Sequence, residues 1–124
     1  TASPRQRLMM LFDGALRFSK RATRCIEDGD LAGKGMYIGK AQAIVQELQN
    51  VLRHDVAPDL CNALSALYTY IIELYSKANL DGDAEAIREA VELLETVRDG
   101  FADASGNEEV SDAEPVALAE ATAG

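Results

Sequence analysis

The chain has 124 residues, of which 48% are hydrophobic and 27% charged, a composition typical of one globular domain. No apolar run approaches the ~20 residues of a membrane-spanning helix, and the first residues, TASPRQR, carry no hydrophobic signal-peptide core, so we expect neither membrane insertion nor secretion. The net charge of −9 opposes binding to nucleic acid, because phosphate backbones are themselves negative.

The first predicted helix spans residues 4–28. Ser3 is its expected N-cap, Pro4 its first helical residue and Gln6 the partner that completes a capping box. The helix region holds six of the twelve basic residues, which we interpret as a solvated face, because Phe18 is the only aromatic residue of note beside them. Apolar or small side chains recur on its main face at helical spacing: Leu8, Leu11, Phe12, Ala15, Ser19, Ala22 and Ile26.

The second predicted helix spans residues 31–53. Gly29 is expected to end the preceding helix and Asp30 to cap this one, and the sequence HDVAPD follows as a break. Three glycines in the segment GKGMYIG weaken its first half, or else allow another backbone to approach closely. Its main apolar face consists of Ile38, Ala41, Val45, Leu48 and Leu52.

The third and fourth predicted helices span residues 58–80 and 84–102, with Asp83 as the cap of the fourth. The main apolar face of the third consists of Leu60, Leu64, Leu67, Ile71, Leu74 and Ala78. That of the fourth consists of Ile87, Ala90, Val91, Leu94, Val97 and Phe101. The opposite side of the fourth helix is rich in glutamate and should be well solvated.

Connections of a few residues between helices of about 20 residues predict an all-α, antiparallel up-down four-helix bundle. We assign this bundle to residues 1–102 as one domain. Residues 103–124, DASGNEEVSDAEPVALAEATAG, are acidic, rich in small residues and free of aromatic side chains. This composition predicts a disordered acidic tail.

A second apolar stripe lies beside the main face of each of the first three helices. A central helix of a bundle needs a wide apolar arc, so any one of these residues could be ordinary core. Together they exceed what four helices can bury, which indicates grooves that hold apolar segments of another chain. The candidate partner-binding residues are Leu8, Met9, Met10, Leu16, Tyr37, Ile44, Val51, Tyr68, Ile72 and Tyr75.

Residues for catalysis or for cofactor or metal binding are hard to find in the sequence. The paired carboxylates of the fourth helix lack a histidine partner, and no glycine-rich phosphate loop is present. Cys25 and Cys61 have no CxxC spacing and are expected to be reduced thiols. His54, the only histidine, leaves a phosphotransfer bundle as the alternative function, although its context at a helix end differs from the exposed mid-helix histidine of such bundles. We therefore expect a non-enzymatic protein without cofactor or metal.

Four segments, in this order and spacing, resemble the FliS family of flagellar secretion chaperones. They are LMMLFDGALRFSKRA, IGKAQAIVQELQNVL, LSALYTYIIELYSKAN and AIREAVELLETVRDGF. The most specific matches are L-x-x-L-F-D-G-A, K-A-Q-x-I-V-x-E-L and L-Y-x-Y followed by K-A-N. The resemblance covers residues 1–102, and Phe101 stands where the family usually has tryptophan.

This resemblance implies a chaperone of the bacterial cytosol that binds the disordered C-terminal segment of flagellin. It implies that the client is kept from premature polymerisation and is delivered to the flagellar export gate. The family usually has a tyrosine-bearing segment before T-A-S-P that can fold over part of the client groove. The sequence begins without methionine, which indicates that native residues precede Thr1. We expect a monomer or a weak homodimer, the latter if the extra stripes pack on a second copy.

Overall fold

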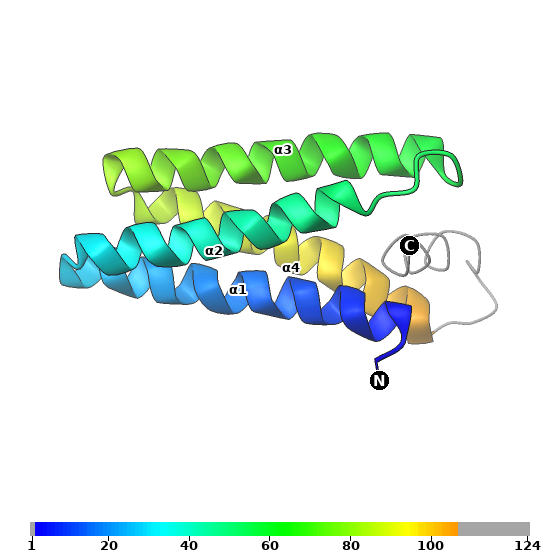
Figure 1. Ribbon diagram of the computed structural model, residues 1–124, viewed down its shortest axis with the longest axis horizontal. Helices are drawn as coiled ribbons and strands as arrows, with labels where there is room; N and C mark the ends of the chain where they lie inside the picture. The colour runs from blue at the N-terminus through cyan, green and yellow to red at the C-terminus, as the bar shows by residue number, and fades with distance from the viewer. Residues whose placement is uncertain (1, 107–124) are drawn as a thin grey trace.

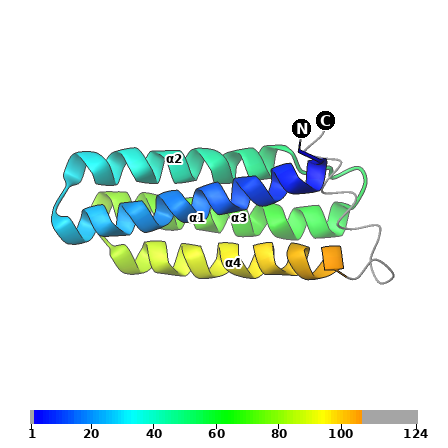
Figure 2. The same cartoon turned by 90° about the horizontal axis from the view of Figure 1, so that it is seen from below.

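Four antiparallel α-helices form a bundle in the computed structural model, which describes residues 2–106. The helices are α1 (Pro4–Asp28), α2 (Leu31–Asn50), α3 (Pro58–Asp81) and α4 (Ala84–Gly106). Each packs on two neighbours, since α1 and α3 both contact α2 and α4 (Figure 1 and Figure 2). The up-down bundle predicted from the sequence is confirmed. Within residues 2–106, none of the four helices is long and apolar enough to cross a membrane.

The predicted helix starts are confirmed in atomic detail. The Ser3 side chain accepts a hydrogen bond from the Gln6 backbone N–H at 3.1 Å, and the Ser3 N–H donates to Gln6 Oε1 at 2.8 Å. These two bonds form the expected capping box. Asp30 Oδ1 accepts from the Gly33 N–H at 2.9 Å, and Asp83 Oδ1 accepts from the Glu85 N–H at 3.0 Å. Side-chain acceptors therefore satisfy N–H groups that the helices themselves leave free.

Two predicted helix ends are wrong. α2 ends at Asn50 rather than at residue 53. The Arg53 carbonyl instead accepts the N–H groups of Val56 and Ala57, at 3.1 and 3.2 Å, so a turn replaces the last helical residues. α4 continues to Gly106, four residues beyond the predicted end, because residues 103–105 include no helix breaker. Residues 103–106 therefore belong to the helix, and the remainder of the predicted disordered tail lies outside the described residues.

The core is assembled from the predicted faces of all four helices. Its large, fully buried side chains include Phe12 of α1, Ile38 of α2, Ile71 of α3 and Leu94 of α4. Some predicted core residues lie at its edge and are only partly buried: Leu11, Ile26, Leu52, Leu60, Leu67, Val91, Val97 and Phe101. The ring of Phe101 lies 5.9 Å from that of Phe12, which joins the end of α4 to the beginning of α1.

A buried hydrogen bond joins α1 to α3, which lie diagonally across the bundle (Figure 2). The hydroxyl oxygens of Ser19 and Tyr75 are 2.5 Å apart, and the Ser19 hydroxyl also donates to the Ala15 carbonyl at 2.7 Å. Because a serine hydroxyl has only one hydrogen, Tyr75 must be the donor to Ser19. Both residues are fully buried. The bond therefore satisfies a phenol that would otherwise be costly to bury.

We expect substitutions of Ser19 and Tyr75 to have non-additive effects on the unfolding free energy. Ser19→Ala leaves the Tyr75 hydroxyl buried without an acceptor and should cost ~1–3 kcal/mol of unfolding free energy. Tyr75→Phe leaves Ser19 bonded to the Ala15 carbonyl and should cost ~1 kcal/mol or less. The double variant should cost less than the sum, measured by urea unfolding. Strict additivity of the two costs would contradict the assignment.

Candidate functional site

Burial divides the ten residues that the sequence analysis assigned to partner binding. Four are buried in the core: Leu8, Leu16, Tyr68 and Tyr75. Five are half-buried: Met9, Tyr37, Ile44, Val51 and Ile72. Met10 alone among the ten is exposed, at 64%. The four buried residues follow the alternative of ordinary core, which the sequence left open for each position, and contact with a partner stays a prediction for the set.

Tyr68 and Tyr75 of α3 are buried because this helix turns a heptad-spaced face toward the core. Cys61, Leu64, Tyr68, Ile71, Tyr75 and Ala78 alternate at spacings of three and four, and all six are buried. The spacing resembles the a and d positions of packed helices. The sequence places the hydroxyl of Ser19 on an otherwise apolar face of α1. Such a position is the signal that could have indicated a buried polar partner such as Tyr75.

Burial changes the acidity of both phenols. Removal from water disfavours the charged form and raises the pKa of Tyr75 to about 12, with the Ser19 hydroxyl beside it acting in the opposite direction. The pKa of Tyr68 is raised mainly for the same reason, with a smaller effect from nearby Cys61. Burial also raises the pKa of the Cys61 thiol and, with Asp30, that of Cys25. Both cysteines are free thiols, as the sequence analysis expected.

Stability should therefore fall as the pH rises above 10. An unfolded tyrosine loses its proton near pH 10, whereas folded Tyr75 keeps its proton to about pH 12. Between these values the folded state binds more protons, so the unfolding free energy should drop by up to ~1.4 kcal/mol per pH unit for this residue. Urea unfolding from about pH 8 to about pH 11 measures the slope. Tyr75→Phe should make the slope shallower, with Tyr68 supplying what remains, and an unchanged slope would contradict this account.

The half-buried candidates do not form one continuous groove. Ile44 of α2 packs across Gly14 of α1, where an added Cβ would lie only 3.1 Å from Ile44 Cδ1. Ile72 lies on α3, diagonally opposite α1, and its backbone carbonyl accepts a hydrogen bond from Gln42 of α2 at 3.3 Å. Gln49 likewise donates to the Ser65 carbonyl at 2.9 Å. Polar side chains of α2 thus cover part of its contact with α3.

Substitutions should separate these edge positions from the core. Leu64 is buried, so Leu64→Asp places an unpaired charge in the core and should remove most of a total stability of ~5–15 kcal/mol. Ile44 and Ile72 are half-buried, so Ile44→Asp and Ile72→Asp should cost ~1–2 kcal/mol and leave the bundle folded. Urea midpoints measure the difference. Unfolding of both isoleucine variants to the extent of Leu64→Asp would show that these positions are core.

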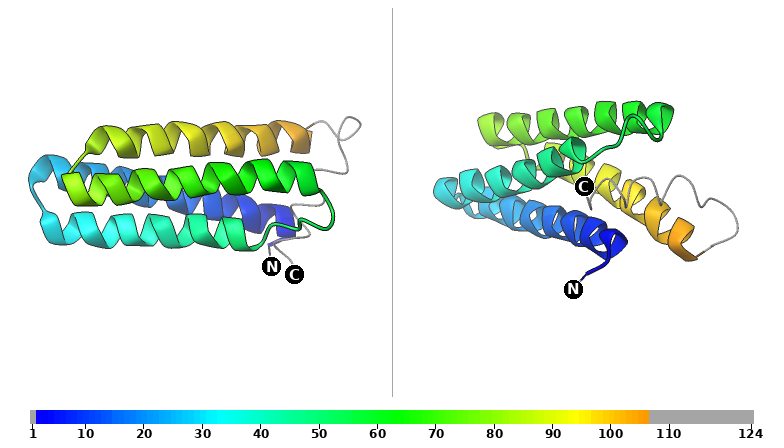
Figure 3. Two further views of the ribbon diagram at one scale, coloured as in Figure 1. Left: turned by 90° about the horizontal axis from the view of Figure 1, so that it is seen from above. Right: turned by 45° about the vertical axis from the view of Figure 1, so that its right-hand side comes forward.

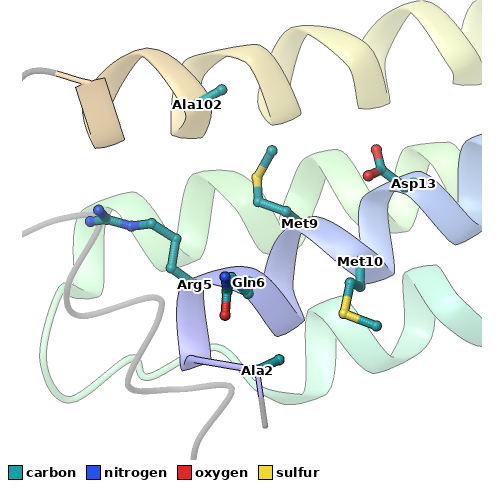
Figure 4. A pocket seen from close by; sticks show the side chains of 7 residues that line it. All are labelled: Ala2, Arg5, Gln6, Met9, Met10, Asp13 and Ala102. Atoms are coloured by element: carbon teal, nitrogen blue, oxygen red, sulfur yellow. The ribbon is translucent and has the colours of Figure 1, made fainter.

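A hollow of about 720 Å³ lies at the end of the bundle where α1 begins and α4 approaches its end (Figure 4). Met9 points toward the side of α1 that faces Ala102 of α4, whereas Met10 points away from α4 (Figure 4). Flexible, polarizable methionines adapt to irregular apolar partners. The lining residues are Ala2, Arg5, Gln6, Met9, Met10, Asp13 and Ala102. Only the two methionines of this set were predicted, because the approach of Ala102 depends on how α4 packs on α1.

An ion pair between α4 and α1 lies at the edge of this hollow. Arg98 Nε donates to Asp13 Oδ1 at 2.6 Å, which joins α4 to α1 at the hollow's edge. The carboxylate of Asp13 raises the pKa of the Arg98 guanidinium, so this arginine stays charged. The pair is largely exposed and contributes more to the register of the two helices than to stability.

The described residues offer little for catalysis. Within residues 2–106, no group of three or more His, Cys, Asp or Glu side chains is placed to hold a metal ion. His54 lies in the turn before α3, where its Nδ1 is 3.0 Å from Asn62 Oδ1. A phosphotransfer bundle would place such a histidine in the middle of a helix. The position of His54 therefore gives no support to that alternative.

Comparison with known proteins gives consistent matches along the four helices. The family model described as flagellar protein FliS matches residues 1–108. The flagellar secretion chaperone FliS of Salmonella typhimurium is 37% identical over 102 residues, 82% of this chain and 76% of that protein. The FliS chaperone of Campylobacter jejuni is 31% identical over 109 residues, 88% of this chain and 85% of that protein. The Escherichia coli FliS chaperone is 33% identical over 102 residues, 82% and 75% of the two chains.

Proposed function

This chain belongs to the FliS family of flagellar secretion chaperones, and from that premise we propose that it binds the disordered C-terminal segment of flagellin. Bound in this way, flagellin is kept from polymerising early and is delivered to the flagellar export gate. The protein acts in the bacterial cytosol, where its client is made. Its role is binding rather than catalysis, since the family is one of chaperones.

The hollow at Met9 and Met10 is the observation that most supports this function. Its volume of about 720 Å³ leaves room for several apolar side chains against an open surface of the bundle. Met10 is 64% exposed and Met9 beside it is half-buried, so the two side chains present apolar surface at the hollow. An amphipathic client helix could place its apolar residues there in the helix-in-groove mode. We therefore place the first client contact at this end of α1 and not at the buried tyrosines of α3.

A disordered client must become ordered as it binds, and that change is measurable. We expect a one-to-one complex with a flagellin C-terminal fragment and a gain in helicity on mixing, because the client orders on the bundle. Circular dichroism and calorimetry measure the two quantities. A spectrum equal to the sum of the parts would contradict coupled folding, and the absence of any complex would contradict the proposed client.

A matched pair of substitutions tests the place of binding within the same assay. Met10→Asp should weaken the complex by about 30-fold, the effect of losing ~2 kcal/mol at an interface hot spot. Leu80→Asp is the control, because Leu80 is 85% exposed and belongs to the last turn of α3. This end of α3 is at the opposite end of the bundle from the beginning of α1 (Figure 1). The control variant should bind flagellin normally. Equal affinity of the two variants would place the client elsewhere on the bundle.

The oligomeric state is part of the same proposal. A monomer or a weak homodimer is expected, because a stable dimer would cover apolar surface that the client needs. Sedimentation of the free protein at several concentrations distinguishes these states from a tight dimer.

A further inference from the structure

Three cations gather around two stacked aromatic rings on the outer surface of α1 and α2. The rings of Phe18 and Tyr37 lie 6.1 Å apart and nearly parallel. The guanidinium carbon of Arg17 is 5.1 Å from the Phe18 centroid, and Lys40 Nζ is 5.5 Å from it. The guanidinium carbon of Arg21 is 5.7 Å from the Tyr37 centroid. We call these five residues the cationic–aromatic patch.

The charge of this patch is not balanced by the described part of the chain. Arg17, Arg21 and Lys40 are all exposed, and none forms an ion pair within 4.0 Å with a carboxylate of residues 2–103. Stacking on the rings stabilises the cations and holds them close together despite their mutual repulsion. The guanidinium N–H groups remain available to donate to carboxylates. The patch therefore fits an acidic ligand, in a protein whose net charge is −9.

Residues 107–124 carry the opposite charge. They contain Glu108, Glu109, Asp112, Glu114 and Glu120 and no lysine or arginine. Because the segment is covalently attached, its effective concentration at the patch is on the order of millimolar, provided that it can reach. A separate acidic protein would have to exceed this concentration or bind more tightly.

The reach follows from the register of α1 against α4. Arg98 bonds to Asp13, which places these two residues at the same level along the bundle. The end of α4 and the beginning of α1 lie at the same end of the bundle (Figure 3). From the level of the ion pair, Gly106 lies eight residues beyond Arg98, or ~12 Å along the bundle axis. Arg17 lies four residues beyond Asp13, or ~6 Å in the opposite direction, so the two distances add. A path of this length around a helix ~10 Å wide needs about seven extended residues. The lengths of the arginine and carboxylate side chains add to this reach, so Asp112, six residues beyond Gly106, is the first carboxylate able to arrive, and Glu114 and Glu120 lie farther along the segment.

We infer that the cationic–aromatic patch is a docking surface for the chain's own acidic segment, with Asp112, Glu114 and Glu120 paired to Arg17, Arg21 and Lys40. The contact covers the α1–α2 face of the free protein. Any other acidic partner of that face must displace the segment first. The inference is independent of flagellin binding, which we place at the hollow where α1 begins and α4 ends.

Zero-length carbodiimide cross-linking of the full chain tests this docking directly. The reagent joins an amine to a carboxylate only when the two are in contact, so Lys40 should be linked to Asp112, Glu114 or Glu120. The link should be intramolecular, as judged from a mixture of isotopically light and heavy protein. The yield of this cross-link should fall about tenfold at about 0.5 M salt, where electrostatic attraction is screened beyond a few ångströms. Absence of the link, or links only between two molecules, would overturn the proposal.

Matched arginine substitutions separate specific docking from general attraction of an acidic segment. Arg17→Gln with Arg21→Gln keeps the reporting amine of Lys40 and should lower its cross-link about fivefold, the effect of two exposed ion pairs. The control, Arg5→Gln with Arg7→Gln, removes the same charge from the same helix outside the patch and should leave the cross-link intact. An equal loss in both double variants would show that net charge alone attracts the segment, and would overturn the proposal.

Discussion

A buried tyrosine hydroxyl needs a hydrogen-bond partner, and this requirement determines how α3 is rotated in the bundle. Tyr75 finds that partner in Ser19, across the bundle on α1, at 2.5 Å. With Tyr75 directed inward, the residues spaced by seven on the same helix, Cys61 and Tyr68, also enter the core. Leu60 and Leu67 are then left at its edge. The position of one polar atom thus decides which apolar side chains of α3 can meet another protein.

This rotation is the part of the structure that the sequence predicted least well. Both the leucine stripe and the tyrosine stripe of α3 have helical spacing, and hydropathy favours the leucines as the inner set. Of the predicted face, Leu64, Ile71, Leu74 and Ala78 are indeed buried. Only Leu60 and Leu67 give up their places to Tyr68 and Tyr75, because a tyrosine buries more apolar area than a leucine once its hydroxyl is hydrogen-bonded. The hydrogen bond of the Tyr75 hydroxyl depends on Ser19, which is 56 residues away in the chain. Local pattern cannot contain such information.

Local features, in contrast, were predicted well. The caps at Ser3, Asp30 and Asp83 depend on atoms within three residues of each other, and all three are present. The bundle topology followed from helix length and short connections, and it is confirmed. Of the residues around the hollow, the sequence singled out Met9 and Met10, but not the approach of Ala102 or the pairing of Asp13 with Arg98. Those features arise only when α4 packs on α1.

The family assignment and the arrangement of the surface lead to one central claim, that the client of this chaperone first contacts the bundle where α1 begins and α4 ends. Amide hydrogen exchange of the chain, with and without the flagellin C-terminal segment, tests this claim most directly. Our account predicts the largest added protection in residues 5–13 and 98–103, around Met9, Met10 and Ala102. Protection confined to α2 and α3, with none at these two segments, would contradict it.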